Sequence, residues 1–170
     1  GDAIGTLNSS NHVHLIAGRT GREMNALGAL SLPGASDSRL PTIENVSLYD
    51  ENWREFETEQ GSDRIKLVGK SRIVVTAFDQ MDGNAARRKL GLYKLGYQVF
   101  DDEGAKVSGF DETIWTIEFD RLPEHAAVKL VYAVGSKSGA TGKTVFRYIV
   151  SNRVSGRYPR ADFFRSDRLQ

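Results

Sequence analysis

Short segments of alternating apolar and polar residues dominate the chain from residue 43 onward. In residues 92–100, for example, Tyr93, Leu95, Tyr97 and Val99 alternate with polar or small residues. Side chains two positions apart on a β-strand point to the same face, so this pattern is typical of a strand with one buried face. The same argument predicts strands at residues 43–49, 65–67, 72–78, 92–100, 113–119, 128–134 and 144–150.

Residues that favour turns separate these predicted strands. They lie at 82–84, 101–104, 122–123 and 138–142, where Gly, Pro and Asp are concentrated. Seven short strands with regular punctuation predict an all-β fold, with an immunoglobulin-like β-sandwich of about seven strands at residues 43–156. The chain has no cysteine, so the disulfide of antibody domains is excluded.

The composition narrows the classes of function. Hydrophobic residues make up 39% of the 170 residues, which is enough to form a core. The 23 Lys and Arg residues nearly balance the 22 Asp and Glu residues, and the formal net charge is +1. The chain therefore lacks the excess of positive charge that would favour a nucleic-acid partner. A thiolate metal site is excluded by the lack of cysteine, and no apolar run is long enough to span a membrane.

Two histidines near the N-terminus are the strongest candidates for a chemical function. His12 and His14 are separated by Val13 alone. On a strand, this spacing would direct both imidazoles into the same space. Neutral imidazole is a common zinc ligand, and a neighbouring imidazole can transfer protons. The alternative interpretation is a pair of solvated or hydrogen-bonded histidines without a metal.

The residues around this pair extend the pattern. Residues 1–7 read Gly-Asp-Ala-Ile-Gly-Thr-Leu, and the pair is followed by Leu15-Ile16-Ala17-Gly18, by Met24-Asn25-Ala26-Leu27 and by Leu32-Pro33-Gly34. Residues 1–33 thereby resemble the C-terminal end of the lysostaphin-type (M23) zinc metallopeptidase domain. In that family a Gly-x-x-Ile-Gly strand leads into a His-x-His strand, and a short hairpin and an Asn-Pro-Leu-like segment come next.

The resemblance implies a role for each histidine. The second histidine of the family motif binds zinc, and this is His14. The first histidine acts beside the metal on the attacking water or on the transition state, and this is His12. In the family, a zinc-polarised water attacks the amide carbonyl of a peptide cross-link in peptidoglycan.

The chain also departs from the family pattern. The other two zinc ligands come from an upstream His-x-x-x-Asp motif, which this sequence lacks. The usual His-Leu-His-Phe-Glu is replaced by His-Val-His-Leu-Ile at residues 12–16, and the glycine-rich approach is replaced by Asn8-Ser9-Ser10-Asn11. A catalytic zinc needs about three protein ligands. We therefore expect this chain alone to be inactive and to hold no zinc, with the missing ligands supplied by an upstream segment or by another chain.

The predicted organisation has four parts: residues 1–33 as the peptidase-like remnant, 34–42 as a polar linker, 43–156 as the β-sandwich and 157–170 as a C-terminal extension. The chain starts within a predicted strand, which indicates a processed product or a cut piece. The extension combines four arginines with Tyr158, Phe163 and Phe164. It is predicted either to pack its aromatic rings on the body, which is the favoured interpretation, or to form an arm that grips a partner or a glycan.

Three other motifs are explained without a ligand. Residues 79–84 superficially resemble a calcium loop, but Asx-Gly turn chemistry explains them more simply. Residues 135–144 contain Gly-x-x-Gly-Lys-Thr, in which the spacing of a phosphate-binding loop is wrong, so a hairpin loop is predicted. His125 follows Leu122-Pro123-Glu124 and is predicted to be a surface residue.

Taken with the resemblance, the sequence predicts a fragment of a secreted or periplasmic bacterial cell-envelope protein. Its partner would be peptidoglycan or another cell-envelope protein, and its β-sandwich would be accessory to an M23-like hydrolase. The alternative is a non-enzymatic β-sandwich module for adhesion or for binding wall polymer or protein. Fold alone does not choose between them, because this architecture carries many functions.

Overall fold

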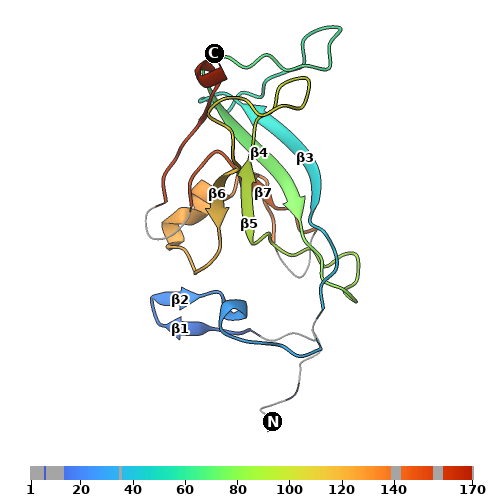
Figure 1. The fold of residues 1–170 in the computed structure, drawn as a ribbon. Coiled ribbons are helices and arrows are strands. Elements are labelled where there is room, and N and C mark those ends of the chain that lie inside the picture. The colour runs from blue at the N-terminus through green and yellow to red at the C-terminus, as the bar shows by residue number, and fades with distance from the viewer. Residues whose placement is uncertain (1–5, 7–13, 35, 139–142, 155–158, 170) are drawn as a thin grey trace.

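The computed structural model describes residues 6, 14–34, 36–138, 143–154 and 159–169 (Figure 1). Its main elements are β-strands, which confirms the all-β class. The strands are β1 (Ala17–Arg19), β2 (Arg22–Met24), β3 (Thr42–Tyr49), β4 (Lys70–Phe78), β5 (Lys94–Tyr97), β6 (Ile114–Glu118), β7 (Arg147–Ile149) and β8 (Phe164–Arg165). The helical segments are η1 (Ala26–Gly28), η2 (His125–Ala127), α1 (Val128–Val131) and η3 (Ser166–Leu169).

The largest sheet is antiparallel and is centred on β4. β3 and β7 pair with the two sides of β4, and β8 pairs with its beginning. Val75 of β4 lies opposite Val46 of β3 and Tyr148 of β7, so these three side chains share a face of the sheet. A bulge between Ile43 and Asn45 interrupts the ladder of β3.

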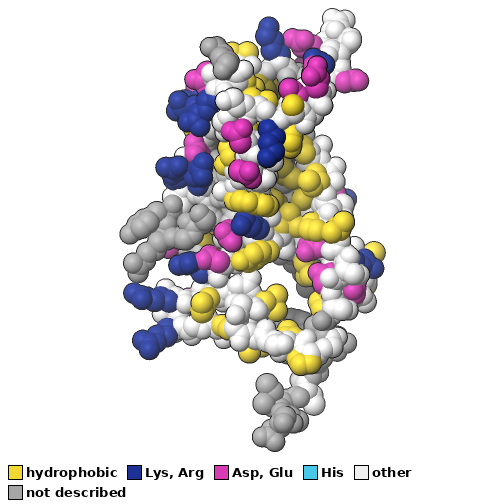
Figure 2. Space-filling view, viewed as in Figure 1, with side chains coloured by type: hydrophobic (Ala, Val, Ile, Leu, Met, Phe, Trp, Pro, Cys, Tyr) yellow, Lys and Arg dark blue, Asp and Glu magenta, His cyan; other side chains and the backbone are white. Residues whose placement is uncertain are grey.

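β3 is the outer strand of this sheet among the described residues, and its apolar side chains are partly uncovered. Ile43 and Val46 are 65% and 51% exposed. Figure 2 shows hydrophobic side chains gathered on the body beside this strand. The strand is nevertheless as long as the sequence pattern predicts, because its pairing with β4 satisfies the backbone.

A second pair, β5 and β6, connects to the chain segment that follows β7. Ile117 of β6 forms a parallel bridge with Val154. The amide of Glu118 donates to the carbonyl of Val154 at 3.1 Å, and the amide of Val154 donates to the carbonyl of Thr116 at 2.7 Å. The chain after β7 therefore joins the two sheets, and the immunoglobulin-like topology stays a prediction.

The main core lies between these two groups of strands. It contains Tyr148 from β7, Leu95 from β5, Ile117 from β6 and Ala77 from β4. A smaller cluster uses the opposite face of the large sheet, where Val74 packs with residues that include Ala133 and Ile149. β4 is thus apolar on both faces, which explains why residues 73–75 read as a continuous apolar run.

Residues 128–134, predicted as a strand, are instead mainly helical. η2 and α1 occupy residues 125–131, and only Tyr132 and Ala133 pair with β7. Ala127 and Val131 are buried, while Val128 and Val134 are exposed. The two buried residues are four positions apart, which is the spacing of one face of a helix. Burial of this face decides the local structure, although valine, leucine and tyrosine also alternate as in a strand.

Three other predicted strands are shorter than the sequence pattern suggests. The segment at 65–67 contributes a single bridge, from Ile65 to Thr58. The strand predicted at 92–100 is regular only from Lys94 to Tyr97, and that predicted at 144–150 only from Arg147 to Ile149. A bulge at Leu95 and Gly96 interrupts the first of these two strands. Leu92 and Leu95 of the first, and Tyr148 and Val150 of the second, are still buried in the main core.

The C-terminal extension packs on the body, as the favoured interpretation predicts. Phe164 of β8 is 5% exposed. Its ring centroid lies 6.1 Å from that of Tyr97 and 5.9 Å from that of Phe110. Within the described residues 159–169, the extension therefore adds a strand and an aromatic anchor to the fold.

The helices that the structure describes are short. None of them, within the described ranges, combines the length and the apolar character needed to cross a membrane.

Gly96 marks a close approach between β5 and β6. A Cβ atom built there would lie 2.6 Å from the carbonyl oxygen of Ile114 and 3.0 Å from the Cα of Trp115. The pairing shifts register at this point, between Leu95 and Gly96. Both obstacles are backbone atoms of β6, so a side chain can be accommodated only if the strands move apart.

We therefore expect Gly96→Ala to lower the free energy of unfolding by about 1–3 kcal/mol. Urea denaturation followed by circular dichroism would measure it. Gly28→Ala is the matched control, because a Cβ at Gly28 meets no atom within 4 Å. Equal stability of the two variants would contradict the close approach.

Candidate functional site

Of the two predicted site residues, the structure describes His14, which precedes a small hairpin. His14 is exposed and lies outside regular structure, three residues before β1 begins. The predicted strand therefore does not include His14. His12, the predicted catalytic residue, lies outside the described residues, and its position relative to His14 is a prediction.

The hairpin of β1 and β2 begins at Ala17, three residues after His14. The two strands are joined by the two-residue turn Thr20–Gly21, in which Gly21 has a φ of 76°. A left-handed φ at this position is accessible to glycine without steric cost. The sequence thus specifies a tight hairpin immediately after the histidine pair.

The hairpin is bonded to the body of the fold through its main chain. The amide of Asn25 donates to the carbonyl of Asp120 at 2.9 Å, and the amide of Leu122 donates to the carbonyl of Glu23 at 2.9 Å. Met24 and Arg121 form a bridge between these bonds. The end of β2 therefore pairs with the segment that follows β6, and this pairing fixes the hairpin against the body.

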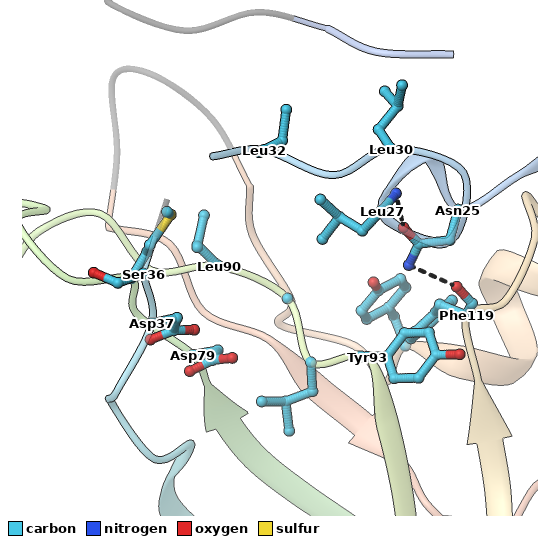
Figure 3. Close-up of a pocket in the computed structure, with 14 residues that line it drawn as sticks. Asn25, Leu27, Leu30, Leu32, Ser36, Asp37, Asp79, Leu90, Tyr93 and Phe119 are labelled. Atoms are coloured by element: carbon cyan, nitrogen blue, oxygen red, sulfur yellow. Dashed lines mark hydrogen bonds between the residues drawn. The ribbon is translucent and has the colours of Figure 1, made fainter. Parts of the chain in front are cut away.

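Asn25 strengthens this junction with its side chain. Its Oδ1 accepts from the amide of Leu27 at 3.0 Å and so caps η1. Its Nδ2 donates to the carbonyl of Phe119 at 3.4 Å. Figure 3 shows both bonds, with Asn25 between η1 and Phe119.

A cavity of about 670 Å³ lies between the segment that follows β2 and the body. The N-terminal side contributes leucines from η1 and the chain after it, and the body contributes aromatic rings, aliphatic side chains and a carboxylate (Figure 3). Its lining residues are Asn25, Leu27, Leu30, Leu32, Ser36, Asp37, Asp79, Met81, Leu90, Gly91, Leu92, Tyr93, Phe119 and Tyr132. An apolar cavity with a few polar groups is the usual form of a binding site for small molecules.

The pKa of one cavity residue is shifted by its surroundings. Burial raises the pKa of the Tyr132 phenol above its ordinary value. The ring of Tyr132 lies 5.4 Å from that of Tyr148, between centroids, so the cavity wall continues into the main core. Its hydroxyl therefore remains neutral at physiological pH and can act as a hydrogen-bond donor.

The described residues do not provide a complete zinc site. Within residues 14–34, 36–138, 143–154 and 159–169 there is no group of three or more His, Cys, Asp or Glu side chains that could hold a metal ion. A catalytic zinc needs about three protein ligands, and His14 would be one of them. The side chains in place therefore do not fit the metal without further ligands.

The other sequence motifs form turns or lie on the surface, and Asp79 and Met81 of the first motif also line the cavity. In residues 79–84, Gly83 has a φ of 75° and the amide of Asn84 donates to the carbonyl of Met81, which is the predicted turn. Lys137 and Val145 exchange main-chain hydrogen bonds at 2.8 and 2.9 Å, which confirms a hairpin around the glycine-rich loop, whose residues 139–142 lie outside the described part. His125 is exposed in η2, as predicted.

The sequence reasoning missed the cavity. Leu27, Leu30 and Leu32 belong to the peptidase-like segment, but their spacing fits neither a strand nor a long helix. The density of leucines was a signal. Three leucines within six residues are unfavourable in water, so they indicate a nearby apolar surface. The sequence does not say that this surface is formed by residues 90–93 and 119, which are distant along the chain.

Comparisons of the chain with protein-family models, with curated proteins and with solved structures found no match in any of the three.

Proposed function

We propose that this chain is part of a bacterial cell-envelope metallopeptidase of the M23 type, which hydrolyses peptide cross-links of peptidoglycan. In this proposal His14 is a zinc ligand and His12 acts beside the metal. The β-body at residues 43–156 is an accessory unit. The remaining His and Asp ligands come from a segment outside this sequence, since no His-x-x-x-Asp motif occurs within it.

The proposal is carried by the hairpin that follows His14. The M23 resemblance implies a short hairpin and then an Asn-Pro-Leu-like segment after the second histidine. β1 and β2 occupy residues 17–24, and Asn25-Ala26-Leu27 follow at once. Order and spacing therefore support the resemblance. His14 is exposed.

The β-body has a physical role in this proposal. The main-chain bonds from Asn25 to Asp120 and from Leu122 to Glu23 hold the hairpin on the body. A ligand residue just before a fixed hairpin loses less conformational entropy when a metal binds. Metal and catalytic sites are most effective when rigid elements hold their residues. We infer that the body positions the C-terminal edge of the peptidase domain.

The test is the zinc content of the protein expressed from its complete reading frame. We expect about one zinc per chain, and we expect His14→Ala to weaken zinc binding by at least about tenfold, because a first ligand is lost. Metal analysis after dialysis against a zinc buffer would measure both. His125→Ala is the matched control, because His125 is an exposed histidine in η2.

Two results would contradict the proposal. One is a reading frame that encodes no His-x-x-x-Asp ahead of residue 1. The other is a His14→Ala protein that keeps its zinc as tightly as the unmodified protein does. Either result would favour the non-enzymatic binding or adhesion module instead.

A further inference from the structure

The cavity between the N-terminal segment and the body has an apolar interior. Leu27, Leu30 and Leu32 line it on one side, and Leu90 and Leu92 on the other. Leu27 is 68% exposed, which is unfavourable for a leucine that nothing covers. An unbranched aliphatic chain in the cavity would remove this apolar surface from water.

Two carboxylates lie on the same side of this cavity. Figure 3 shows Asp37 and Asp79 there, with Tyr93 and Phe119 across from them. Among the described residues, the carboxylate of Asp37 accepts one bond, from the amide of Arg39 at 3.1 Å, and that of Asp79 accepts one bond at its Oδ1, from the amide of Gln80 at 2.8 Å. Each carboxylate keeps an oxygen for a further donor.

No lysine or arginine in the described part of the chain forms an ion pair with either carboxylate. The nearby guanidinium of Arg39 is directed elsewhere: it donates to Oε1 of Gln80 at 3.1 Å and lies 4.0 Å from Asp82. Asp37 is exposed and Asp79 is partly buried. Two negative charges at the edge of an apolar cavity attract a cation, and the attraction is stronger where water is partly excluded, as at Asp79.

Asp82 lies in the same region, and its carboxylate accepts several hydrogen bonds. It accepts from the amide of Ser38 at 3.0 Å, from the hydroxyl of Ser38 at 3.2 Å and from the hydroxyl of Ser36 at 3.4 Å. It holds the chain that carries Asp37 in place. Within the part of the chain that the structure describes, Asp37 and Asp79 make no comparable set of bonds, so their role differs from that of Asp82.

The aromatic rings complete the chemistry of the cavity. Tyr93, Phe119 and Tyr132 all line it. An alkylammonium ion therefore matches the cavity: the carboxylates suit its charged end, and the leucines and rings suit its aliphatic chain.

We propose that this cavity binds an unbranched aliphatic chain that ends in a primary ammonium group, such as the side chain of a lysine-like residue in a peptide. The carboxylates of Asp37 and Asp79 receive the ammonium group, and the leucines enclose the methylene groups. The assignment goes beyond the metallopeptidase proposal and does not depend on a metal.

The test uses the chain of residues 1–170 with n-hexylammonium as the probe and hexan-1-ol as the neutral control. Titration followed by two-dimensional NMR would give both affinities and the residues affected. We expect hexylammonium to bind with a dissociation constant on the order of 1 mM, as ligands of this size do. We expect hexan-1-ol to bind at least about tenfold more weakly, because it lacks the charge.

Substitutions identify the carboxylates that are responsible. Asp79→Asn and Asp37→Asn keep the side-chain shape and remove one charge each, and each should weaken hexylammonium binding by about tenfold. Asp111→Asn is the matched control, since Asp111 is an exposed aspartate that does not line the cavity. It should leave the affinity unchanged. Amide spectra of each variant would show that the fold is retained.

Three outcomes would overturn the proposal. The first is equal affinity for hexylammonium and hexan-1-ol. The second is a loss of affinity in Asp111→Asn as large as that in Asp79→Asn. The third is binding of calcium but not of hexylammonium at the two carboxylates, which would assign them to a metal ion. None of these outcomes bears on zinc at His14, so the two proposals fail separately.

Discussion

Tyr148→Ala is expected to lower the free energy of unfolding by about 3–5 kcal/mol, the cost of truncating a large buried ring. Tyr148 is fully buried at the centre of the main core. Its ring packs against those of Tyr132 and Phe146, with centroids 5.4 and 6.1 Å away. Since small domains are stabilised by about 5–15 kcal/mol in total, this one change would remove a large share.

The hydroxyl of Tyr148 makes a separate contribution that Tyr148→Phe isolates. The amide of Leu92 donates to this oxygen at 2.9 Å in a buried position. Burial raises the pKa of the Tyr148 phenol, so the group stays neutral across physiological pH. Removing the oxygen leaves the amide of Leu92 without its acceptor, and we expect a loss of about 1–3 kcal/mol.

Urea denaturation of the three proteins would measure both contributions. Tyr93→Phe is the matched control for the hydroxyl, because Tyr93 is 51% exposed. We expect it to change stability by less than about 0.5 kcal/mol. A Tyr148→Phe protein as stable as the unmodified chain would contradict the hydrogen bond to Leu92.

Asn152→Ala is expected to cost about 2–4 kcal/mol, because one buried side chain satisfies two partly buried main-chain groups. Its Nδ2 donates to the carbonyl of Leu130 in α1 at 2.8 Å, and its Oδ1 accepts from the amide of Asp162 at 3.1 Å. Asn152 is itself buried. It therefore connects α1 to the C-terminal extension, and alanine would break both connections.

Hydrogen exchange would show whether Asn152 acts in this way. In Asn152→Ala we expect faster exchange of the amide of Asp162 in addition to lower global stability. Asn52→Ala is the matched control, since Asn52 is exposed and lies in a surface turn. Unchanged exchange at Asp162 would show that the extension is held by other contacts, such as the packing of Phe164.

The predicted strands are most accurate where an alternating segment pairs along its length with one antiparallel strand. The predicted ranges 43–49 and 72–78 match β3 and β4 closely, and 113–119 matches β6. Each of these strands has a long antiparallel partner or lies on the main core. The class of the fold follows from these elements.

Prediction fails where two periodicities coexist. Residues 127–134 carry apolar side chains that fit both an alternating and a helical spacing. Just before this segment the chain contains Pro123 and Glu124, and Ala126 and Ala127 come next. These residues favour the start of a helix. The tertiary contacts of Ala127 and Val131 with the main core decide between the two.

For the candidate sites, too, the sequence suggests the part formed by neighbouring residues and misses the part formed by distant ones. His12 and His14 are candidates from the sequence alone because the features that suggest them are local: two imidazoles, one spacing and the residues beside them. It does not identify the cavity, because that site is built from three separate parts of the chain, around residues 25–37, 79–93 and 119–132. Long-range bonds bring these parts together, among them those from Asn25 to Asp120 and from Ser38 to Asp82.

The most direct measurement of the central claim is a crystal structure of the protein from the complete reading frame, with anomalous data collected at the zinc absorption edge. Our account expects a zinc peak about 2.0–2.1 Å from an imidazole nitrogen of His14. It also expects the hairpin at residues 17–24 to stay paired with Asp120 and Leu122. A structure with the chain fully ordered and no metal at His14 would contradict it.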